Sequence, residues 1–273
     1  MSTIYRYIKK LVFYISYPIR KKTNELYKKH DGESCYIFGD GISIKFYDLK
    51  QFSDKISIVG NYIPFHNDFE SLNAPYCVMT APFYFSPIFG YENPKFKKYL
   101  YKTSKLYKQL ISKYKKKYFF LNLSNYPFVK SKNVYFNFLN YSDKRLNETF
   151  ISNRINCFSG VLRNSISLAI YMGFSKIHLV GCDYTFTPTQ QLHWYEKGEG
   201  VSLEMPGYEN EFFKIASEFA EITTVTLNGK SDILNHITYE KLTGKKPLFR
   251  ENTELMDIKY LDVLSTWEGY SIY

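Results

Sequence analysis

The feature that most constrains the fold is a short apolar run that ends in a glycine turn, and this pattern occurs twice. Cys35–Phe38 is apolar and aromatic and ends at Gly39–Gly41, whereas Lys176–Val180 is rich in β-branched residues and ends at Gly181–Asp183. Short apolar runs bounded by glycine are typical of buried strands. We therefore expect each strand to be followed by a flexible turn at one edge of a sheet.

Further strands and helices alternate between and after these two runs. We expect strands at Ile56–Val59, Cys77–Thr80, Tyr118–Leu123, Val134–Phe138 and Thr224–Leu227. We expect helices over 95–117, Ser165–Met172 and Tyr208–Glu221, and a last one capped by Ser231. Strand–helix–strand alternation implies right-handed crossovers and a mostly parallel sheet. The predicted fold class is α/β, a Rossmann-like and mostly parallel sheet flanked by helices.

The charge is unevenly distributed along the 273 residues, whose net charge is +10. Residues 1–30 hold eight Lys and Arg against one acid, and residues 95–118 hold ten Lys and no acid. The remaining chain carries 18 − 25 = −7. This distribution favours attachment to a surface over a nucleic-acid groove. We expect two parts, a basic segment over 1–30 and a single folded domain over 31–273.

The N-terminal segment has the pattern of an interfacial helix. Its apolar stretch, Leu11–Ile19, is far shorter than the ~20 residues that span a bilayer. Apolar residues recur at helical spacing beside basic ones, at Ile4, Tyr5, Ile8, Leu11, Val12 and Ile15. We expect residues 1–30 to hold a cytoplasmic protein to the inner face of the cytoplasmic membrane. The alternative is a docked terminal helix with a solvated lysine face.

The cysteine spacing and the lack of metal-binding motifs limit which disulfides and metal sites the chain can form. Cys35, Cys77, Cys157 and Cys182 form no CxxC pair and require no disulfide, which fits a reducing compartment. There is no Asp-x-Asp, no His-x-x-x-His and no cluster of Cys and His. We therefore expect no metal site and no cofactor.

Ligands of open α/β sheets bind beyond the carboxyl ends of the strands, where three loops qualify. The loop 39–43 contains two glycines that would let the backbone approach a phosphate or ribose, although a plain tight turn explains it equally well. The loop 60–62 follows the second strand. The loop 181–195 is the most polar, with Asp183, Tyr184, His193 and Tyr195.

His193 is the candidate base of that polar loop. A neutral imidazole can take a proton from a hydroxyl, and tyrosine hydroxyls can donate to a leaving phosphate. The alternative is an ordinary surface histidine. His178 lies in the middle of a strand, and His30, His66 and His236 lack comparable polar neighbours in the sequence.

Six motifs occur in an order that resembles the bacterial sialyltransferases of glycosyltransferase family 42 and related lipooligosaccharide and capsule enzymes. They are Gly39–Ser43, Gly60–Asn61, Leu123–Tyr126, Arg154–Val161, Leu168–Asp183 and Leu227–Leu234. The resemblance covers about residues 35–242. It implies a metal-independent, Rossmann-like variant of the GT-A fold that uses a CMP-activated donor and inverts the anomeric carbon.

The resemblance also implies roles for individual residues. His193 would be the general base, Tyr184 and Tyr195 would hydrogen-bond the leaving phosphate, and Arg154 would lie nearby. The nucleotide side would be formed by Gly39, Asp40, Gly41, Ser43, Asn61, Ser159, Gly160 and Asp183. The partners implied are a CMP-activated donor of a sialic-acid-like or Kdo-like sugar and a glycan or glycolipid acceptor, in an enzyme that can form homo-oligomers.

Two departures from the family pattern limit the transfer of these roles. Asp40 replaces an asparagine, which places a negative charge near the nucleotide and favours contact with ribose or cytosine over phosphate. The long segment between the family's Gly-x-Asp and its histidine is reduced to nine residues between Asp183 and His193. The roles of Tyr184 and Tyr195 are left open by this shortening, as are the sugar, the linkage and the acceptor.

Two other functions are compatible with parts of the sequence. A pterin diphosphokinase-like enzyme would share the glycine loop and the Gly-x-Asp pattern, but it would ordinarily use a divalent metal. A basic nucleic-acid-binding protein would explain the aromatic content of 19% and the two lysine-rich segments. The net acidic remainder and the lack of a recognition motif argue against it.

Overall fold

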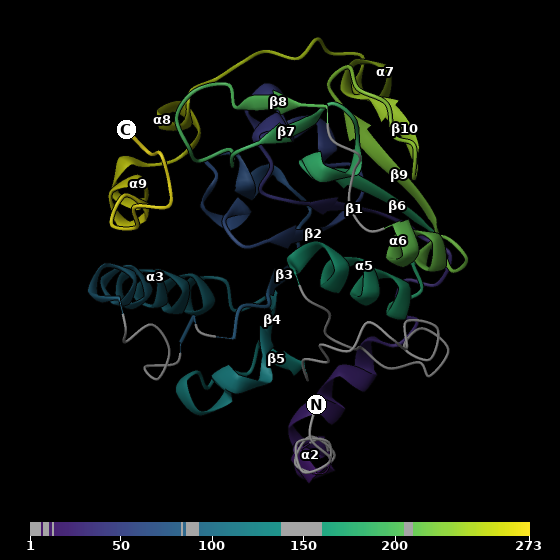
Figure 1. The fold of residues 1–273 in the computed structure, drawn as a ribbon. Coiled ribbons are helices and arrows are strands. Elements are labelled where there is room, and N and C mark those ends of the chain that lie inside the picture. Colours follow the sequence, from purple (N-terminus) through teal and green to yellow (C-terminus); the bar gives the residue numbers. More distant parts are fainter. Residues whose placement is uncertain are drawn as a thin grey trace.

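The computed structural model describes residues 7, 11–12, 14–82, 84–85, 93–137, 160–204 and 210–273. Within them, eight strands form one sheet in the order β10-β9-β6-β1-β2-β3-β4-β5, and every neighbouring pair is parallel (Figure 1). The strands are β1 (Ser34–Phe38), β2 (Ile56–Gly60), β3 (Tyr76–Met79), β4 (Tyr118–Asn122), β5 (Val134–Asn137), β6 (Lys176–Val180), β9 (Glu221–Thr226) and β10 (Asn235–Thr238). The chain is therefore an α/β protein with a Rossmann-like parallel sheet, as the sequence predicts.

Helices cover both faces of the sheet, with α3 and α9 on one face and α5 and α6 on the other (Figure 1). The α-helices are α2 (Tyr17–Arg20), α3 (Pro94–Lys113), α5 (Val161–Tyr171), α6 (Asn210–Ala216), α7 (Tyr239–Thr243), α8 (Asn252–Leu255) and α9 (Ile258–Leu264). A separate antiparallel hairpin is formed by β7 (Thr189–Gln191) and β8 (Val201–Leu203).

Strand β1, in the middle of the sheet, contacts both helix layers. Cys35 and Ile37 of β1 belong to the apolar core under α5 and α6, whereas Tyr36 and Phe38 belong to the core under α3 and α9. A strand that is buried on both faces needs apolar side chains at every position, which explains the continuous run. Cys77 and Cys182 are buried and free, like Cys35, whereas Cys157 lies outside the described residues.

The lysine-rich helix α3 confirms the helix expected over 95–117, although it ends at Lys113. The side chain of Asn93 accepts hydrogen bonds from the backbone N–H groups of Lys95 and Phe96, and so caps its first turn. Tyr99, Leu100, Thr103, Tyr107, Leu110 and Ile111 are its buried residues. The lysines are left on the opposite face.

The helix expected after Ser231 is wrong, because the chain continues instead into strand β10. Ser231 Oγ donates to the carbonyl of Thr185 at 2.5 Å and accepts from the backbone N–H of Leu234 at 3.2 Å. A serine before an apolar run is a capping signal, but here it ties a turn to the loop after β6. The helix expected over Tyr208–Glu221 is also shorter, since Glu221 already begins β9.

The end of the N-terminal segment docks on the domain. Leu26 is fully buried, and the backbone N–H of Lys28 donates to the carbonyl of Tyr171 at the end of α5. Leu11 and Ile15, by contrast, are 59% and 68% exposed. Among the described residues, no helix is long and apolar enough to cross a membrane.

The topology places two turns side by side at one edge of the sheet. From β1 the chain builds outward through β2, β3, β4 and β5, and it then returns to add β6 on the other side of β1. The carboxyl ends of β1 and β6 therefore meet at the point where the strand order reverses. This is the place where open α/β sheets form a ligand crevice.

Candidate functional site

The turns after β1 and β6 are held together by main-chain hydrogen bonds. The N–H of Gly39 donates to the carbonyl of Val180, and the N–H of Gly41 donates to the carbonyl of Gly181, both at 2.8 Å. These bonds continue the pairing of β1 and β6 beyond the strands. The two motifs that the sequence presents separately thus form one structural unit.

Asp183, in the turn after β6, also binds the turn after β1 through Ser43. Its carboxylate accepts from the backbone N–H of Ser43 at 2.8 Å and from the Ser43 hydroxyl at 2.5 Å. Both residues are buried, and burial raises the pKa of Asp183 to about 6 against the hydrogen bonds from Ser43, which lower it. The hydroxyl of Ser43 is therefore already engaged within the protein.

The glycines of the first turn are explained by the same packing. A Cβ atom on Gly41 would lie 2.4 to 2.6 Å from three carboxyl-group atoms of Asp183, and one on Gly39 would lie 2.5 Å from the carbonyl oxygen of Gly181. No side chain fits at such distances. The space next to both glycines is filled by the second turn.

Asp40 joins three segments at this edge. Its Oδ1 accepts from the indole Nε1 of Trp194 at 3.2 Å and from the backbone N–H of Tyr62 at 3.3 Å, with a further hydrogen bond from Asn61. Burial raises the pKa of Asp40 to about 6, opposed by the nearby His193. Asn61 follows β2 and has a positive φ of 20°. Because Asn61 and Tyr62 both donate to Asp40, the loop after β2 lies at the same site.

His193 lies against the first turn, where it forms an isolated antiparallel bridge with Gly41. Its ring stacks on Tyr195, with centroids 5.0 Å apart and planes inclined by 8°. Its Nδ1 lies 2.7 Å from Oε1 of Glu196, while its side chain remains 40% exposed. The imidazole is thus held on two sides and open on another.

The hydrogen bond to Glu196 determines which nitrogen of His193 can accept a proton. Glu196 is 3% exposed, and although burial acts to raise its pKa, hydrogen bonds from His193 and from the Ser271 backbone lower it below the ordinary value. An ionised carboxylate can only accept, so Nδ1 carries the hydrogen. In the neutral imidazole, Nε2 is therefore the basic atom, and it has no hydrogen-bond partner within the described part of the chain.

The two predicted tyrosines differ sharply in their surroundings. Tyr184 is 47% exposed at the start of the loop, whereas Tyr195 is 1% exposed. Tyr195 belongs to a cluster of aromatic rings and hydroxyl groups behind His193, which comprises Tyr62, Tyr84, Tyr99, Tyr107, Tyr195 and Tyr270. In this arrangement Tyr195 supports the imidazole, and Tyr184 is the tyrosine that solvent reaches.

Gly160 stands at the N-terminus of α5 with a positive φ of 88°, and no described atom lies within 4 Å of a Cβ placed on it. The following Val161 would lie 3.0 Å from a Cβ on Gly60, so this helix begins beside the end of β2. A helix N-terminus at this edge suits an anion. Arg154 and Ser159 lie outside the described residues.

Three site residues were missed in the sequence: Glu196, Trp194 and Tyr270, whose ring lies edge-on to His193 at 5.6 Å. Glu196 follows His193 by three residues, a spacing that could have suggested the pair. The fold gives His30 and His66 polar partners that lie elsewhere in the structure or in the next turn. His30 Nε2 lies 2.7 Å from the hydroxyl of Tyr76, and His66 Nδ1 accepts from the N–H of Asp68 at 3.0 Å. Both are buried below the surface.

The fold and the site together define a Rossmann-like α/β protein with a histidine–glutamate pair at the carboxyl edge of its sheet. No family model matches the chain, and no curated protein matches it either. A search of solved structures found the crystal structure of the sialyltransferase CST-II in complex with a trisaccharide acceptor and CMP. The TM-score is 0.42 at 12% sequence identity, and the match covers 86% of this chain and 99% of the other.

Proposed function

We propose that the chain is a metal-independent, inverting glycosyltransferase that moves a sialic-acid-like or Kdo-like sugar from a CMP donor to a surface-glycan acceptor. The observation that carries the proposal is the hydrogen bond from His193 Nδ1 to Glu196. It leaves a basic Nε2 at an exposed position beside the Gly39–Gly41 turn. A reaction that begins by removing a proton from a hydroxyl needs such a base.

The acceptor hydroxyl gives its proton to Nε2 of His193 while its oxygen attacks the anomeric carbon of the donor sugar. The bond between that carbon and the phosphate oxygen breaks, and CMP leaves with the electron pair. Glu196 stabilises the imidazolium that forms, because its carboxylate faces Nδ1.

The nucleotide is proposed to bind where the loops after β1 and β2 meet the N-terminus of α5. Asp40 and Asn61 offer polar groups for ribose or cytosine, and the backbone at Gly160, with Arg154 and Ser159, would face the phosphate. Tyr184 is the tyrosine proposed to donate to that phosphate. Ser43, Asp183 and Tyr195 would act by holding the loops and the imidazole in place.

We also propose roles for the two parts of the chain. Residues 1–30 would attach the enzyme to the inner face of the cytoplasmic membrane, residues 31–273 would form the catalytic domain, and a homo-oligomer is compatible with both. An acceptor that is a lipooligosaccharide or capsule glycan would be presented at that membrane. None of these assignments is needed for the role of His193.

The test replaces His193 with alanine and measures transfer from a panel of CMP sugars alongside CMP binding by calorimetry. Transfer should fall by about 10² to 10⁴-fold while CMP affinity changes little. His236→Ala, an exposed histidine of β10, is the matched control and should transfer normally. Undiminished transfer by His193→Ala would overturn the assignment of the base.

A thermal-shift screen separates the alternative functions. Stabilisation by CMP that is indifferent to a chelator supports the glycosyltransferase. A Mg-dependent effect of ATP would favour a diphosphokinase, and salt-sensitive DNA binding without a nucleotide effect would favour a nucleic-acid-binding protein.

A further inference from the structure

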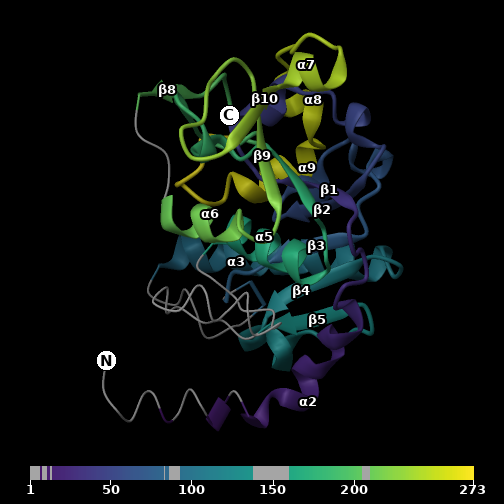
Figure 2. The same ribbon diagram turned by 90° about the vertical axis from the view of Figure 1, so that its right-hand side faces the viewer.

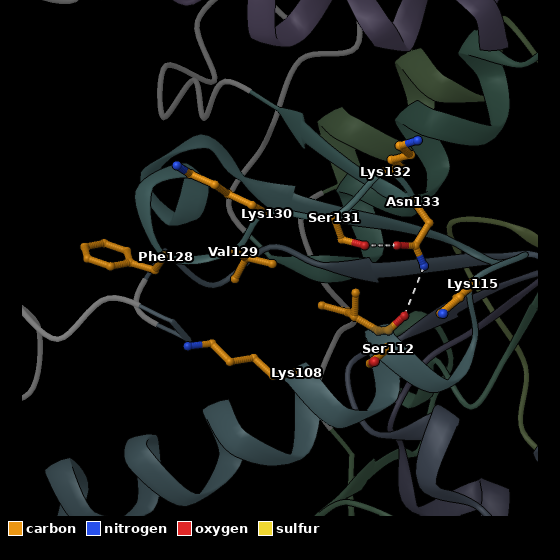
Figure 3. A pocket seen from close by; sticks show the side chains of 10 residues that line it. Lys108, Ser112, Lys115, Phe128, Val129, Lys130, Ser131, Lys132 and Asn133 are labelled. Carbon is orange, nitrogen blue, oxygen red and sulfur yellow. Dashed lines mark hydrogen bonds between the residues drawn. The ribbon is translucent and has the colours of Figure 1, made fainter.

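A pocket lies between the end of α3 and the segment that enters β5. It has a volume of about 590 Å³, and its lining includes four lysines, Lys108, Lys115, Lys130 and Lys132. Figure 3 shows the lysines coming from both walls, two from α3 and the turn after it and two from the segment before β5. Among the described residues that line the pocket, none is acidic.

Within the described part of the chain, no ion pair neutralises the lysines of this pocket. Between Glu92 and Asp143 the sequence contains no acid. Two other lysines of α3 do form ion pairs, Lys95 with Glu268 and Lys113 with Glu70. For the four pocket lysines, the described residues provide no ion pair.

Stabilisation of the end of α3 does not account for the four lysines. The last carbonyls of the helix region are satisfied by Asn133, whose Nδ2 donates to the carbonyls of Ile111 at 3.2 Å and Tyr114 at 3.1 Å. Ser131 in turn donates to Oδ1 of Asn133 at 2.5 Å (Figure 3). A helix end carries about half an elementary negative charge, far less than four ammonium groups provide.

The exposed apolar part of the N-terminal segment lies on the same side of the molecule. Helix α2 contacts β5, and Lys22 binds the segment to the pocket wall through hydrogen bonds to the carbonyls of Lys132 and of Val134, the latter at 3.2 Å. Beyond α2, Leu11, Val12 and Ile15 are exposed. Figure 2 shows this segment and β5 at one end of the molecule and α7 at the other.

We infer that the pocket binds the phosphate groups of anionic membrane lipids, with the exposed side chains of Leu11 and Ile15 entering the bilayer beside it. Lysine ammonium groups bind phosphate as point charges, and apolar side chains next to a basic surface are a known combination for peripheral attachment. A soluble phosphate or a nucleic acid would use the lysines but would leave these apolar side chains exposed to water. The combination therefore favours a lipid surface.

The experiment measures partition of the full chain onto vesicles of phosphatidylcholine with and without phosphatidylglycerol. The test variant is Lys108→Gln, Lys115→Gln, Lys130→Gln and Lys132→Gln combined. The matched control removes the same charge elsewhere, with Lys214→Gln, Lys241→Gln, Lys245→Gln and Lys246→Gln on α6 and around α7. Far-UV circular dichroism and melting curves check that both fold.

The wild type should prefer the anionic vesicles, and the pocket variant should lose about fivefold in partition for each lysine, on the order of several hundredfold in total. The control should lose much less, and Leu11→Ser with Ile15→Ser should weaken binding to the same vesicles. Equal losses in both lysine variants would overturn the inference, because net charge alone would then explain binding. The inference would also be overturned if the wild type did not bind vesicles. Tight binding of glycerol phosphate or single-stranded DNA in place of vesicles would overturn it too.

This inference does not depend on the proposed transfer reaction. With a soluble acceptor, the pocket variant should transfer sugar at the wild-type rate even when it no longer binds vesicles. Failure of transfer in the wild type would therefore contradict the glycosyltransferase, whereas failure of vesicle binding would contradict only the pocket.

Discussion

The carboxylate of Glu196 lies 2.7 Å from Nδ1 of His193, and it is buried while the imidazole remains open to solvent. The same carboxylate also accepts from the backbone N–H groups of His193 and Ser271. Glu196 thus determines both the orientation and the tautomer of the proposed base. A further carboxylate, that of Asp40, accepts a hydrogen bond from the indole of Trp194, the residue that follows His193.

Replacing Glu196 with glutamine should lower kcat by about 10²-fold or more, because the imidazole loses its orienting acceptor and the charge that stabilises the imidazolium. Pre-steady-state rates measure the loss, and urea unfolding checks the fold of the variant. An unchanged kcat in a variant that is merely less stable would assign Glu196 a structural role instead.

Replacing Ser43 with alanine should destabilise the protein by about 1 to 3 kcal/mol, because the buried carboxylate of Asp183 loses its hydroxyl donor. Urea unfolding measures the change. Ser53→Ala, at an exposed position on the neighbouring segment, should change the free energy of unfolding by less than about 0.5 kcal/mol. Equal effects at the two positions would contradict the assignment of the Ser43–Asp183 pair.

Replacing Gly41 with alanine should destabilise the protein by about 1 to 3 kcal/mol, because the new Cβ would overlap the carboxyl group of Asp183. In the background of Asp183→Ala the same substitution should cost much less. A double-mutant cycle therefore predicts a coupling energy of about 1 kcal/mol or more. Strictly additive effects would show that the two turns do not restrict each other.

His66 should make the protein less stable in mild acid. Burial lowers the pKa of His66 to about 4, so the unfolded chain, with a pKa near 6.5, binds a proton that the folded chain excludes. Stability from this group is present above about pH 6.5 and is lost as the pH falls toward 4.

The substitution His66→Asn keeps an acceptor for the N–H of Asp68 and removes the titration. Between about pH 7 and pH 5 the wild type should lose about 2 kcal/mol more stability than this variant. Urea unfolding at the two values measures the difference. Parallel pH dependence in both proteins would mean that His66 does not titrate in this range.

Much of the fold could be predicted because burial leaves a local pattern. The runs around Ile37, Ile58 and Leu179 are short, mostly apolar and end at a glycine, as is typical of buried strands. Helix α3 showed its apolar spacing as clearly. The predicted helix after Ser231 failed because the same local signal serves two purposes, a helix cap and a turn, and only β9 decides between them.

The candidate site was predictable only in part. The sequence indicated His193 and the two turns because loops after parallel strands share an edge of the sheet. It did not show that Tyr195 is buried, that Trp194 reaches Asp40 or that Glu196 faces the imidazole. Residues 181–195 have no regular periodicity, so no pattern indicates which of their side chains point inward.

The sequence by itself thus determined most of the elements, since the periodicity of apolar residues records how each segment is buried. Only the tertiary structure decided which turns meet. Ser43 and Asp183 are 140 residues apart, and their contact depends on the chain returning past β1 to form β6. The same return explains why residues 39 and 41 are glycines, because the second turn occupies the space that their side chains would need.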